Sequence, residues 1–342
     1  MKHFKTLGLV LALAPTMVFA QAATERASSV LSDLASPEMV ARFKKEAEKH
    51  LACPDISAED KKIAAFVELQ THRWSRKDIG CAALYGNQLA MAHPDNPELV
   101  LGALGAYVTA FDVLSSDYNG LYEGPQTGAE LSLRWERTRE SGLKLIEAMK
   151  EAYKDVLEFK ILHGAFMLSA YGQESSVEQR VEAVGQSIAL LEDALKQDPK
   201  ALGGLTPYLL GRTYLSLPAY AGGDSLRALE LLKQGAEINP DDISMLRWLA
   251  EAHIGERENK EALAVIHQAI EIAPEKSNPQ VYADELRAMG GFAKRLGDAE
   301  LADRIYTMRD AFLDTHPQIN TRKSTASMGH GGVDPFTGKQ VK

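Results

Sequence analysis

The sequence predicts an all-α fold in which helical hairpins stack as repeats in a right-handed superhelix. Leucine and alanine recur at helical spacing from about residue 37 to residue 317, and alternating β-branched runs of the strand type are almost absent. In addition, Pro240 and Pro274 each follow an amphipathic helix and lie 34 residues apart, a period typical of stacked helical hairpins. We therefore expect one helical repeat domain over residues 37–319.

Length and composition are consistent with such a domain and exclude several other classes of protein. The chain has 342 residues, of which 45% are hydrophobic and 25% charged, so it can bury a sizeable core. Lys and Arg total 38 against 47 Asp and Glu, which gives a formal net charge of −9. This sign argues against a general affinity for nucleic acid or anionic lipid.

The first twenty residues have the pattern of a secretory signal peptide. Lys2 and Lys5 precede the apolar run LGLVLALA at 7–14, and Val18 and Ala20 stand where a cleavage site requires small or branched residues. The alternative, a membrane anchor, needs roughly 20 apolar residues, and neither this run nor any later segment is that long. We therefore predict cleavage after residue 20, export to the periplasm, a flexible mature N-terminus over 21–36 and no membrane span.

The chain has two cysteines, Cys53 and Cys81, which lie 28 positions apart. In an oxidising compartment a structural disulfide is expected between them. Closing a loop of this size stabilises a fold by about 3 to 4 kcal/mol. The alternative is a redox or metal-binding thiol pair, but the sequence has neither a CxxC spacing nor a histidine cluster beside these cysteines.

The clearest repeat unit runs from Ile243 to Pro274. Small residues, Ala250 and Ala262, stand where its two helices are expected to cross, because a larger side chain there would push the helices apart. The other pattern positions of this unit are Leu246, Leu249, His253, Ile266 and Ala269. The preceding unit has five extra residues between its helices, and its pattern positions are Leu210, Gly211, Tyr214, Ala228, Leu232, Gly235 and Pro240.

Weaker units flank these two, so four or five hairpins are expected in total. Upstream, a first helix is marked by Gly164 and Met167 and its second helix by Ser187, Leu191, Ala194 and Pro199. Downstream, a degenerate unit is marked by Met289, Gly290, Ala302 and Tyr306, with Arg309 in place of the expected small residue. Near the start, a further hairpin is indicated by Ala82, Pro94, Leu104 and Gly105.

The extra residues of the unit before Ile243 form a loop over 216–224. Pro218 is expected to end the first helix, Gly222 and Gly223 to turn the chain, and Asp224 to cap the second helix. One hypothesis is that this loop, with Tyr220, contacts a partner. A second long loop is predicted over 115–128, and the glycine-rich tail over 320–342 lacks helical periodicity and is predicted to be disordered.

These patterns resemble two known groups of proteins. The 34-residue period with its small and large positions is similar to the tetratricopeptide repeat. Ordered motifs over about 80–310 resemble the T component of TRAP transporters, periplasmic all-helical proteins with cryptic tetratricopeptide motifs. These motifs are residues 96–101 and 105–107, residues 133–139 with Gly142 and Leu143, and Gly211 and Tyr214 followed by Pro218 and Gly222-Gly223-Asp224.

The second resemblance implies a helical accessory protein that associates into a small oligomer with a central cavity and works beside a periplasmic solute-binding protein. The chain departs from that family in three ways. It lacks a lipobox, since Leu51-Ala52-Cys53 lies far beyond the apolar run, and it carries the two cysteines and the glycine-rich tail. The missing lipobox argues against tethering to a membrane.

Catalytic motifs are not found in the sequence. It contains no HExxH, GxSxG or phosphate-binding P-loop pattern, so we predict a non-catalytic protein without a cofactor. His253 stands at a position usually filled by a core aromatic residue, which favours packing over catalysis. Met328 and His330, with Asp334, are weak candidate copper ligands, because few ligands in a flexible tail bind weakly. The basic segment 73–77 is interpreted as a solvated helix end.

The repeat register also predicts which side chains line a binding groove. They are Tyr208, Arg212 and Leu215 in one unit, Arg247, Glu251 and Ile254 in the next, and Arg287, Lys294 and Arg295 in the last. Arginine binds carboxylates through two parallel hydrogen bonds, so an acidic protein partner or a small carboxylate ligand is one hypothesis. The alternative is that Glu251 and Glu237 neutralise these arginines in surface pairs that contribute little.

Taken together, the sequence predicts an exported binding scaffold. The favoured function is that of a periplasmic accessory of solute uptake, with a solute-binding protein as partner and homo-oligomer formation as a further expectation. A protein-interaction scaffold for cell-envelope assembly is the alternative, and a metal-handling periplasmic protein is a third candidate.

Overall fold

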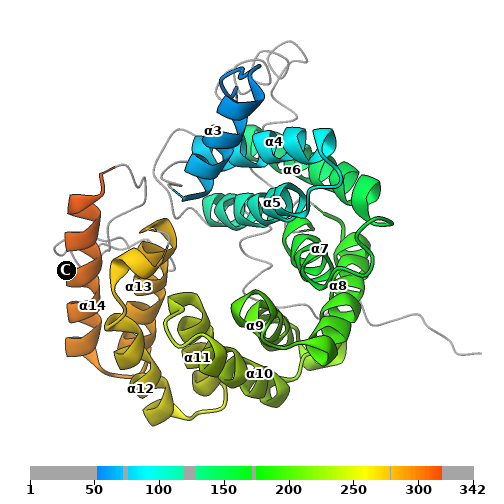
Figure 1. Cartoon of the computed structure of the whole chain (residues 1–342). Coiled ribbons are helices and arrows are strands. Elements are labelled where there is room, and N and C mark those ends of the chain that lie inside the picture. Colours follow the sequence, from blue (N-terminus) through cyan, green and yellow to red (C-terminus); the bar gives the residue numbers. More distant parts are fainter. Residues whose placement is uncertain (1–51, 72–75, 119–127, 172–174, 278, 318–342) are drawn as a thin grey trace, which may run out of the picture. The chain divides into compact units, whose positions relative to one another are not determined.

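The computed structural model describes residues 52–71, 76–118, 128–171, 175–277 and 279–317. These residues form twelve α-helices and two short 3-10 helices and contain no strand, which confirms the predicted all-α repeat fold (Figure 1). None of the helices in these ranges is long and apolar enough to cross a membrane. The predicted signal peptide, the segment 21–36, residues 73–75 and the tail with Met328 and His330 lie outside the described residues.

By their contacts, residues 53–125 and 134–342 form one compact unit. Of the other unit, the structure describes residue 52 and residues 128–133, the first turns of one helix. The arrangement below is that of the larger unit.

Four helices precede the main hairpins: α3 (Glu59–Thr71), α4 (Arg76–Ala92), α5 (Pro97–Tyr118) and α6 (Gly128–Met149). Helix α4 packs against α3 and α5, and the pair α4 and α5 is the hairpin indicated by Ala82 and Leu104, both buried. Helix α6 is tied to α7 by Trp135, whose indole N–H donates to the carbonyl of Ala170 at 2.8 Å. The loop was predicted to begin at residue 115, but α5 continues to Tyr118, because extending an established helix by a turn costs little. Residues 119–127 of the predicted loop lie outside the described residues.

Four helical hairpins follow. They pair α7 (Leu157–Ala170) with α8 (Val177–Gln197), α9 (Ala201–Ser216) with α10 (Ser225–Ile238), α11 (Ile243–Gly255) with α12 (Asn259–Ile270), and α13 (Pro279–Arg295) with α14 (Ala299–Thr315). A 3-10 helix, η1 (Ala219–Ala221), joins α9 to α10, and another, η2 (Pro274–Lys276), joins α12 to α13. These hairpins are the four units predicted from the pattern of small and large residues.

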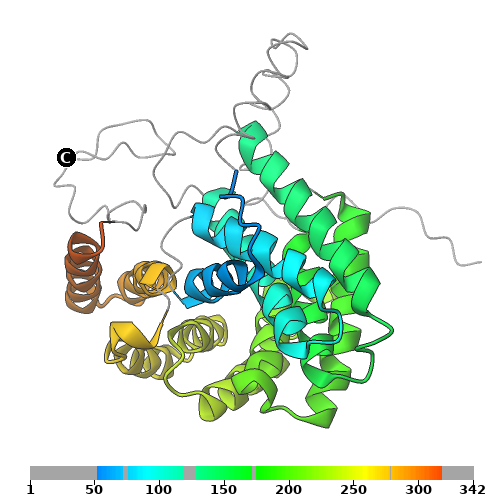
Figure 2. The ribbon, with the colours of Figure 1, turned by 45° about the horizontal axis from the view of Figure 1, so that its top comes forward.

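The hairpins are arranged in two layers. The first helices pack on one another, α7 on α9, α9 on α11 and α11 on α13, and we call them the first-helix layer. Each second helix packs on its own partner and on the first helix of the next hairpin, as α10 does on α11. The two views in Figures 1 and 2 show the hairpins following one another in sequence order, from green through yellow to orange.

Small residues lie where paired helices cross, as the pattern predicted. A Cβ atom added at Gly211 would lie 2.7 Å from Cγ of Leu232, and one added at Gly290 would lie 2.6 Å from the ring of a tyrosine on α14. Ala250 and Ala262 are completely buried. Because real Cβ contacts are never this short, these crossings require the residues that the sequence has.

Side-chain caps explain where several helices begin. Asp242 accepts hydrogen bonds from two backbone N–H groups of the first turn of α11, at 2.9 and 3.0 Å, and Asp298 accepts one from α14 at 2.9 Å. At α8, Ser176 and Gln179 form a reciprocal capping box. Such caps satisfy backbone donors that have no partner within the helix and fix the position of each turn.

The predicted disulfide is present between Cys53 and Cys81, with a Cα–Cα distance of 5.5 Å. Cys81 is buried in α4, so the bridge fastens the segment before α3 to α4, the helix that follows α3. Tyr85, one turn further along α4, donates a hydrogen bond to the carbonyl of Pro54 at 2.6 Å. The bridge and this hydrogen bond hold the same segment against the same helix.

Candidate functional site

The nine residues predicted to line a groove all lie on the first-helix layer. Helix α9 carries Tyr208, Arg212 and Leu215, helix α11 carries Arg247, Glu251 and Ile254, and helix α13 carries Arg287, Lys294 and Arg295. Tyr208, Leu215 and Ile254 are half-buried and pack against the hydrophobic core clusters, so these three side chains hold the helices together. The charged residues of the row differ from one another in their burial and in their partners, which the sequence does not show.

Three arginines alternate with two aromatic rings across α9, α11 and α13. The guanidinium carbon of Arg247 lies 4.0 Å from the ring centroid of Trp248 and 5.5 Å from that of Phe292. The guanidinium carbon of Arg212 lies 5.3 Å from the ring centroid of Trp248, and that of Arg295 lies 5.2 Å from the ring centroid of Phe292. We call these five residues the arginine–aromatic ladder. Each cation–π contact contributes roughly 0.5 to 2 kcal/mol, so the ladder links three consecutive hairpins.

Arg247, at the centre of the ladder, also meets two carboxylates. Its Nη1 lies 2.9 Å from Oε2 of Glu251, and its Nε lies 3.6 Å from Oε2 of Glu285 on α13. Only 19% of the Arg247 side chain is exposed. At Arg247, Glu251 therefore neutralises a groove arginine, as the alternative prediction from the sequence stated. The second carboxylate, Glu285, was not predicted as a partner.

Glu285 is the most electrostatically unusual group of this surface. Burial raises the pKa of its carboxyl to about 7, while Arg247, a hydrogen bond from Ser244 and the more distant Arg212 oppose that rise. Asp284, its neighbour along α13, raises the pKa further. The desolvation of the carboxylate thus outweighs the attraction of the nearby arginines.

The three cations of α13 have a different setting. Arg287, Lys294 and Arg295 are exposed to solvent, and the aromatic contact of Arg295 leaves its guanidinium accessible. Hence the row of cations predicted from the repeat register divides into a half-buried part on α9 and α11 and an exposed part on α13. Binding by any of these residues stays a prediction.

Trp248, Phe292 and Glu285 are members of this surface that the sequence reasoning missed. Each lies one or two positions from a predicted groove residue: Trp248 follows Arg247 directly, and Glu285 precedes Arg287 by two. The register assigned only groove-lining positions, whereas these three side chains contact the preceding helix of the layer: Trp248 meets Arg212 on α9, and Phe292 and Glu285 meet Arg247 on α11. The available signals were Trp248 directly after Arg247 and Phe292 one helical turn before Arg295.

The loop between α9 and α10 folds as its residues predicted. Helix α9 ends at Ser216 just before Pro218, and Gly222 has a φ of +91°, a conformation that favours glycine. A Cβ at Gly223 would lie 1.8 Å from a backbone carbonyl oxygen, and Asp224 caps α10 by accepting from the N–H of Arg227 at 3.0 Å. Tyr220 is 62% exposed, so its ring is available for a contact.

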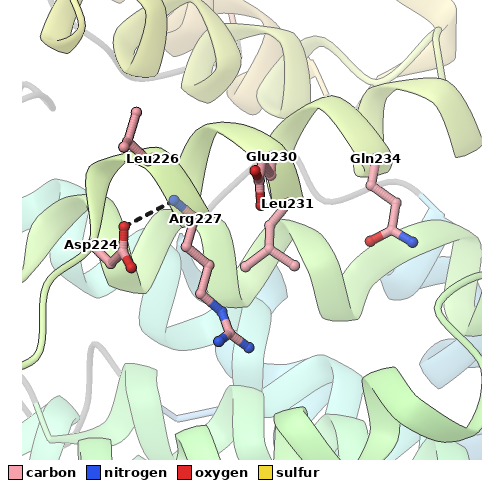
Figure 3. A pocket seen from close by; sticks show the side chains of 6 residues that line it. All are labelled: Asp224, Leu226, Arg227, Glu230, Leu231 and Gln234. Atoms are coloured by element: carbon pink, nitrogen blue, oxygen red, sulfur yellow. Dashed lines mark hydrogen bonds between the residues drawn. The ribbon is translucent and has the colours of Figure 1, made fainter.

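An open hollow of 520 Å³ lies along α10, next to this loop (Figure 3). It is lined by Asp224, Leu226, Arg227, Glu230, Leu231 and Gln234. Arg227 forms an ion pair with Glu192 of α8 and lies over the ring of Tyr214, whereas Leu226 is 64% exposed and points the other way. A second hollow of 400 Å³ shares Gln234 and continues toward the turn before α9.

Two other residues singled out by sequence have structural settings. His253 is buried, and its Nδ1 lies 2.7 Å from Oε2 of Glu258, which agrees with a packing role. Arg309 is completely buried, and its Nε donates to the carbonyl of Ala283 at 2.9 Å. In the described ranges, no three His, Cys, Asp or Glu side chains are grouped as a metal site would require.

A comparison with protein families matches part of the chain. Residues 219–287, from η1 through α10, α11 and α12 into α13, match the family model of the tetratricopeptide repeat. A search of curated proteins finds no significant match to the chain. Repeats of this kind are typically non-catalytic, and arrays of them present extended surfaces to protein partners. The match therefore supports a TPR-like protein and indicates a protein-interaction scaffold.

Proposed function

We propose that this chain is an exported, non-catalytic scaffold whose first-helix layer binds a protein partner, and that it serves solute uptake in the manner of a TRAP-transporter T component. The observation that carries the proposal is the arginine–aromatic ladder across α9, α11 and α13. Arginine and tryptophan are enriched among the residues that dominate binding at protein interfaces. Side chains already held in place by one another lose little conformational freedom on binding.

The cellular setting follows from the sequence. The charged and apolar pattern of residues 1–20 supports export, and the bridge between Cys53 and Cys81 is in keeping with an oxidising compartment. The assignment to solute uptake rests on the ordered motifs over about 80–310 that resemble the T component. The natural partner in that setting is the solute-binding protein of the same uptake system.

The proposal is tested by calorimetry with the mature chain, residues 21–342. The titrant is the solute-binding protein of a TRAP transporter encoded beside this chain. We expect saturable binding that weakens about tenfold in Arg212→Gln, since this removes one end of the ladder. The matched control is Arg304→Gln, which removes an exposed arginine of α14 that pairs with Glu271.

Each other outcome points to a different function. Absence of binding to the solute-binding protein, with binding to an envelope-assembly protein instead, would replace solute uptake by the alternative scaffold role. Binding that Arg212→Gln and Arg304→Gln weaken equally would remove the first-helix layer as the contact surface. Calorimetric binding of a small carboxylate by the isolated chain would assign a ligand to the layer instead of a protein.

A further inference from the structure

The cations of α13 are exposed and differ in their partners from the arginines of α9 and α11. Arg212 and Arg247 are engaged by Trp248, and Arg247 also lies between two carboxylates. Arg287, Lys294 and Arg295, by contrast, are exposed and form no ion pair with a carboxylate among the residues that the structure describes.

Gly291 lies in the middle of these three cations. On a helix, the neighbours of a residue are those three and four positions away, and Arg287, Lys294 and Arg295 stand at −4, +3 and +4 from Gly291. A Cβ added there would meet only the hydroxyl oxygen of Tyr306, at 3.9 Å. At Gly291 the backbone of α13 therefore carries no side chain, while cationic side chains stand three and four positions away on either side; we call this place the α13 notch.

Glycine at this position is not needed for packing within the hairpin. The adjacent Gly290 faces α14, where a Cβ would lie 2.6 Å from Tyr306, but Gly291 has room for a larger residue. A glycine in an exposed helix also costs roughly 1 kcal/mol relative to alanine. What Gly291 provides is an approach to the backbone of α13 for whatever the surrounding cations attract.

We propose that the α13 notch is the docking point for an acidic segment of the partner protein, whose carboxylates meet Arg287, Lys294 and Arg295 while the segment lies over Gly291. This rests on the proposed function, because it assumes a protein bound to the first-helix layer. The chain carries a net charge of −9, so an acidic partner is repelled by most of its surface and attracted only where cations gather. The notch therefore sets the position of that partner.

A protein segment fits this site better than a free small anion. Exposed cations in water are screened by salt and bind a single anion weakly. A covering protein surface excludes water from the same charges, which strengthens their attraction. The notch is open, so a segment of chain can lie across it.

The probe for the test is a fluorescent helical peptide of about 12 residues that combines glutamate and leucine, compared with its glutamine counterpart. Binding to the full mature chain is followed by fluorescence anisotropy at about 50 and 200 mM salt. Two variants change the notch: Arg287→Gln with Lys294→Gln removes charge, and Gly291→Leu fills the notch while keeping every charge.

Each variant has a matched control. Lys233→Gln with Lys260→Gln removes two exposed lysines of the second helices α10 and α12. Gly185→Leu fills an exposed helical glycine of α8, where a Cβ would meet nothing within 4 Å. We expect both notch variants to weaken binding of the glutamate peptide about tenfold and both controls to change it less than about twofold.

The proposal is overturned if the glutamate peptide does not bind, if its glutamine counterpart binds equally well, or if the controls weaken binding as much as the notch variants do. Competition by citrate at the affinity of the peptide would also overturn it, in favour of a small anion. The outcome is separable from that of the proposed function. Binding of the solute-binding protein that ignores the α13 variants would refute the notch alone, and peptide binding without any binding of that protein would refute solute uptake alone.

Discussion

Replacing Glu285 by glutamine is expected to change how the stability of the chain depends on pH. The carboxyl of Glu285 lies 3.6 Å from Nε of Arg247, in a setting where only 16% of its side chain is exposed. Burial raises its pKa from 4.5 to about 7, in spite of the arginines on α9 and α11 and the hydroxyl of Ser244. Glutamine has nearly the same shape and cannot ionise, so it removes the titration and keeps the packing.

The sign of the effect follows from the direction of the shift. Between pH 4.5 and about 7 the folded chain holds the Glu285 proton more tightly than the unfolded chain does. The contribution of Glu285 to the free energy of unfolding is therefore fully present below about pH 4.5. It falls as the pH rises from 4.5 to about 7. A shift of this size corresponds to roughly 3 kcal/mol. Glu285→Gln should thus stabilise the chain at about pH 8 and have little effect at about pH 4.5.

The assay is urea unfolding followed by circular dichroism, for wild type and Glu285→Gln, at several pH values between about 4.5 and 8. Glu251→Gln is the control, because Glu251 meets the same Arg247 from a more exposed position. Its effect should stay below about 1 kcal/mol. Parallel curves of stability against pH for wild type and Glu285→Gln would refute the reasoning, since the wild-type curve must then depend on other groups.

Three further predictions concern the packing of the array. Gly211→Ala should destabilise by about 1 to 3 kcal/mol, because its Cβ would lie 2.7 Å from a buried leucine, whereas Gly185→Ala at an open position should stabilise by up to about 1 kcal/mol; equal effects in urea unfolding would contradict this. Replacing Cys53 and Cys81 by serine should cost about 3 to 4 kcal/mol, and oxidised and reduced wild type should differ by a similar amount in the same assay. Asp224→Ala should cost about 1 kcal/mol and speed amide hydrogen exchange in the first turn of α10; unchanged exchange would show that its cap is not needed.

Most of the fold could be predicted because its determinants are local in sequence. Pro240 and Pro274 set the period, Gly211 and Ala250 mark the helix crossings, and Asp224 marks a helix start. Each of these residues acts on backbone within its own hairpin, so the spacing along the chain carries the information. The end of α5 was placed too early, because turn-forming residues at a helix end do not show how far a well-packed helix continues.

The candidate site was predicted less completely, because it depends on contacts between hairpins. Arg247 was correctly placed on the first-helix layer, but whether it points to solvent or to the next helix depends on the rotation of α11 against α13. That rotation brings Glu285 to Arg247 from 38 positions away in the chain. The repeat register assigns residues to positions within one hairpin, so it does not predict a contact between two hairpins.

The ladder also has a mechanical consequence. In a linear array each hairpin touches only its neighbours, so the weakest boundary between hairpins decides where the array comes apart. The alternating cations and rings cross two boundaries in succession, from α9 to α11 and from α11 to α13. Fraying that starts at the C-terminal hairpin has to pull Phe292 from Arg247, and that arginine holds Trp248. We therefore expect the last three hairpins to open as one block, with a load on α13 carried to α9 through the ladder.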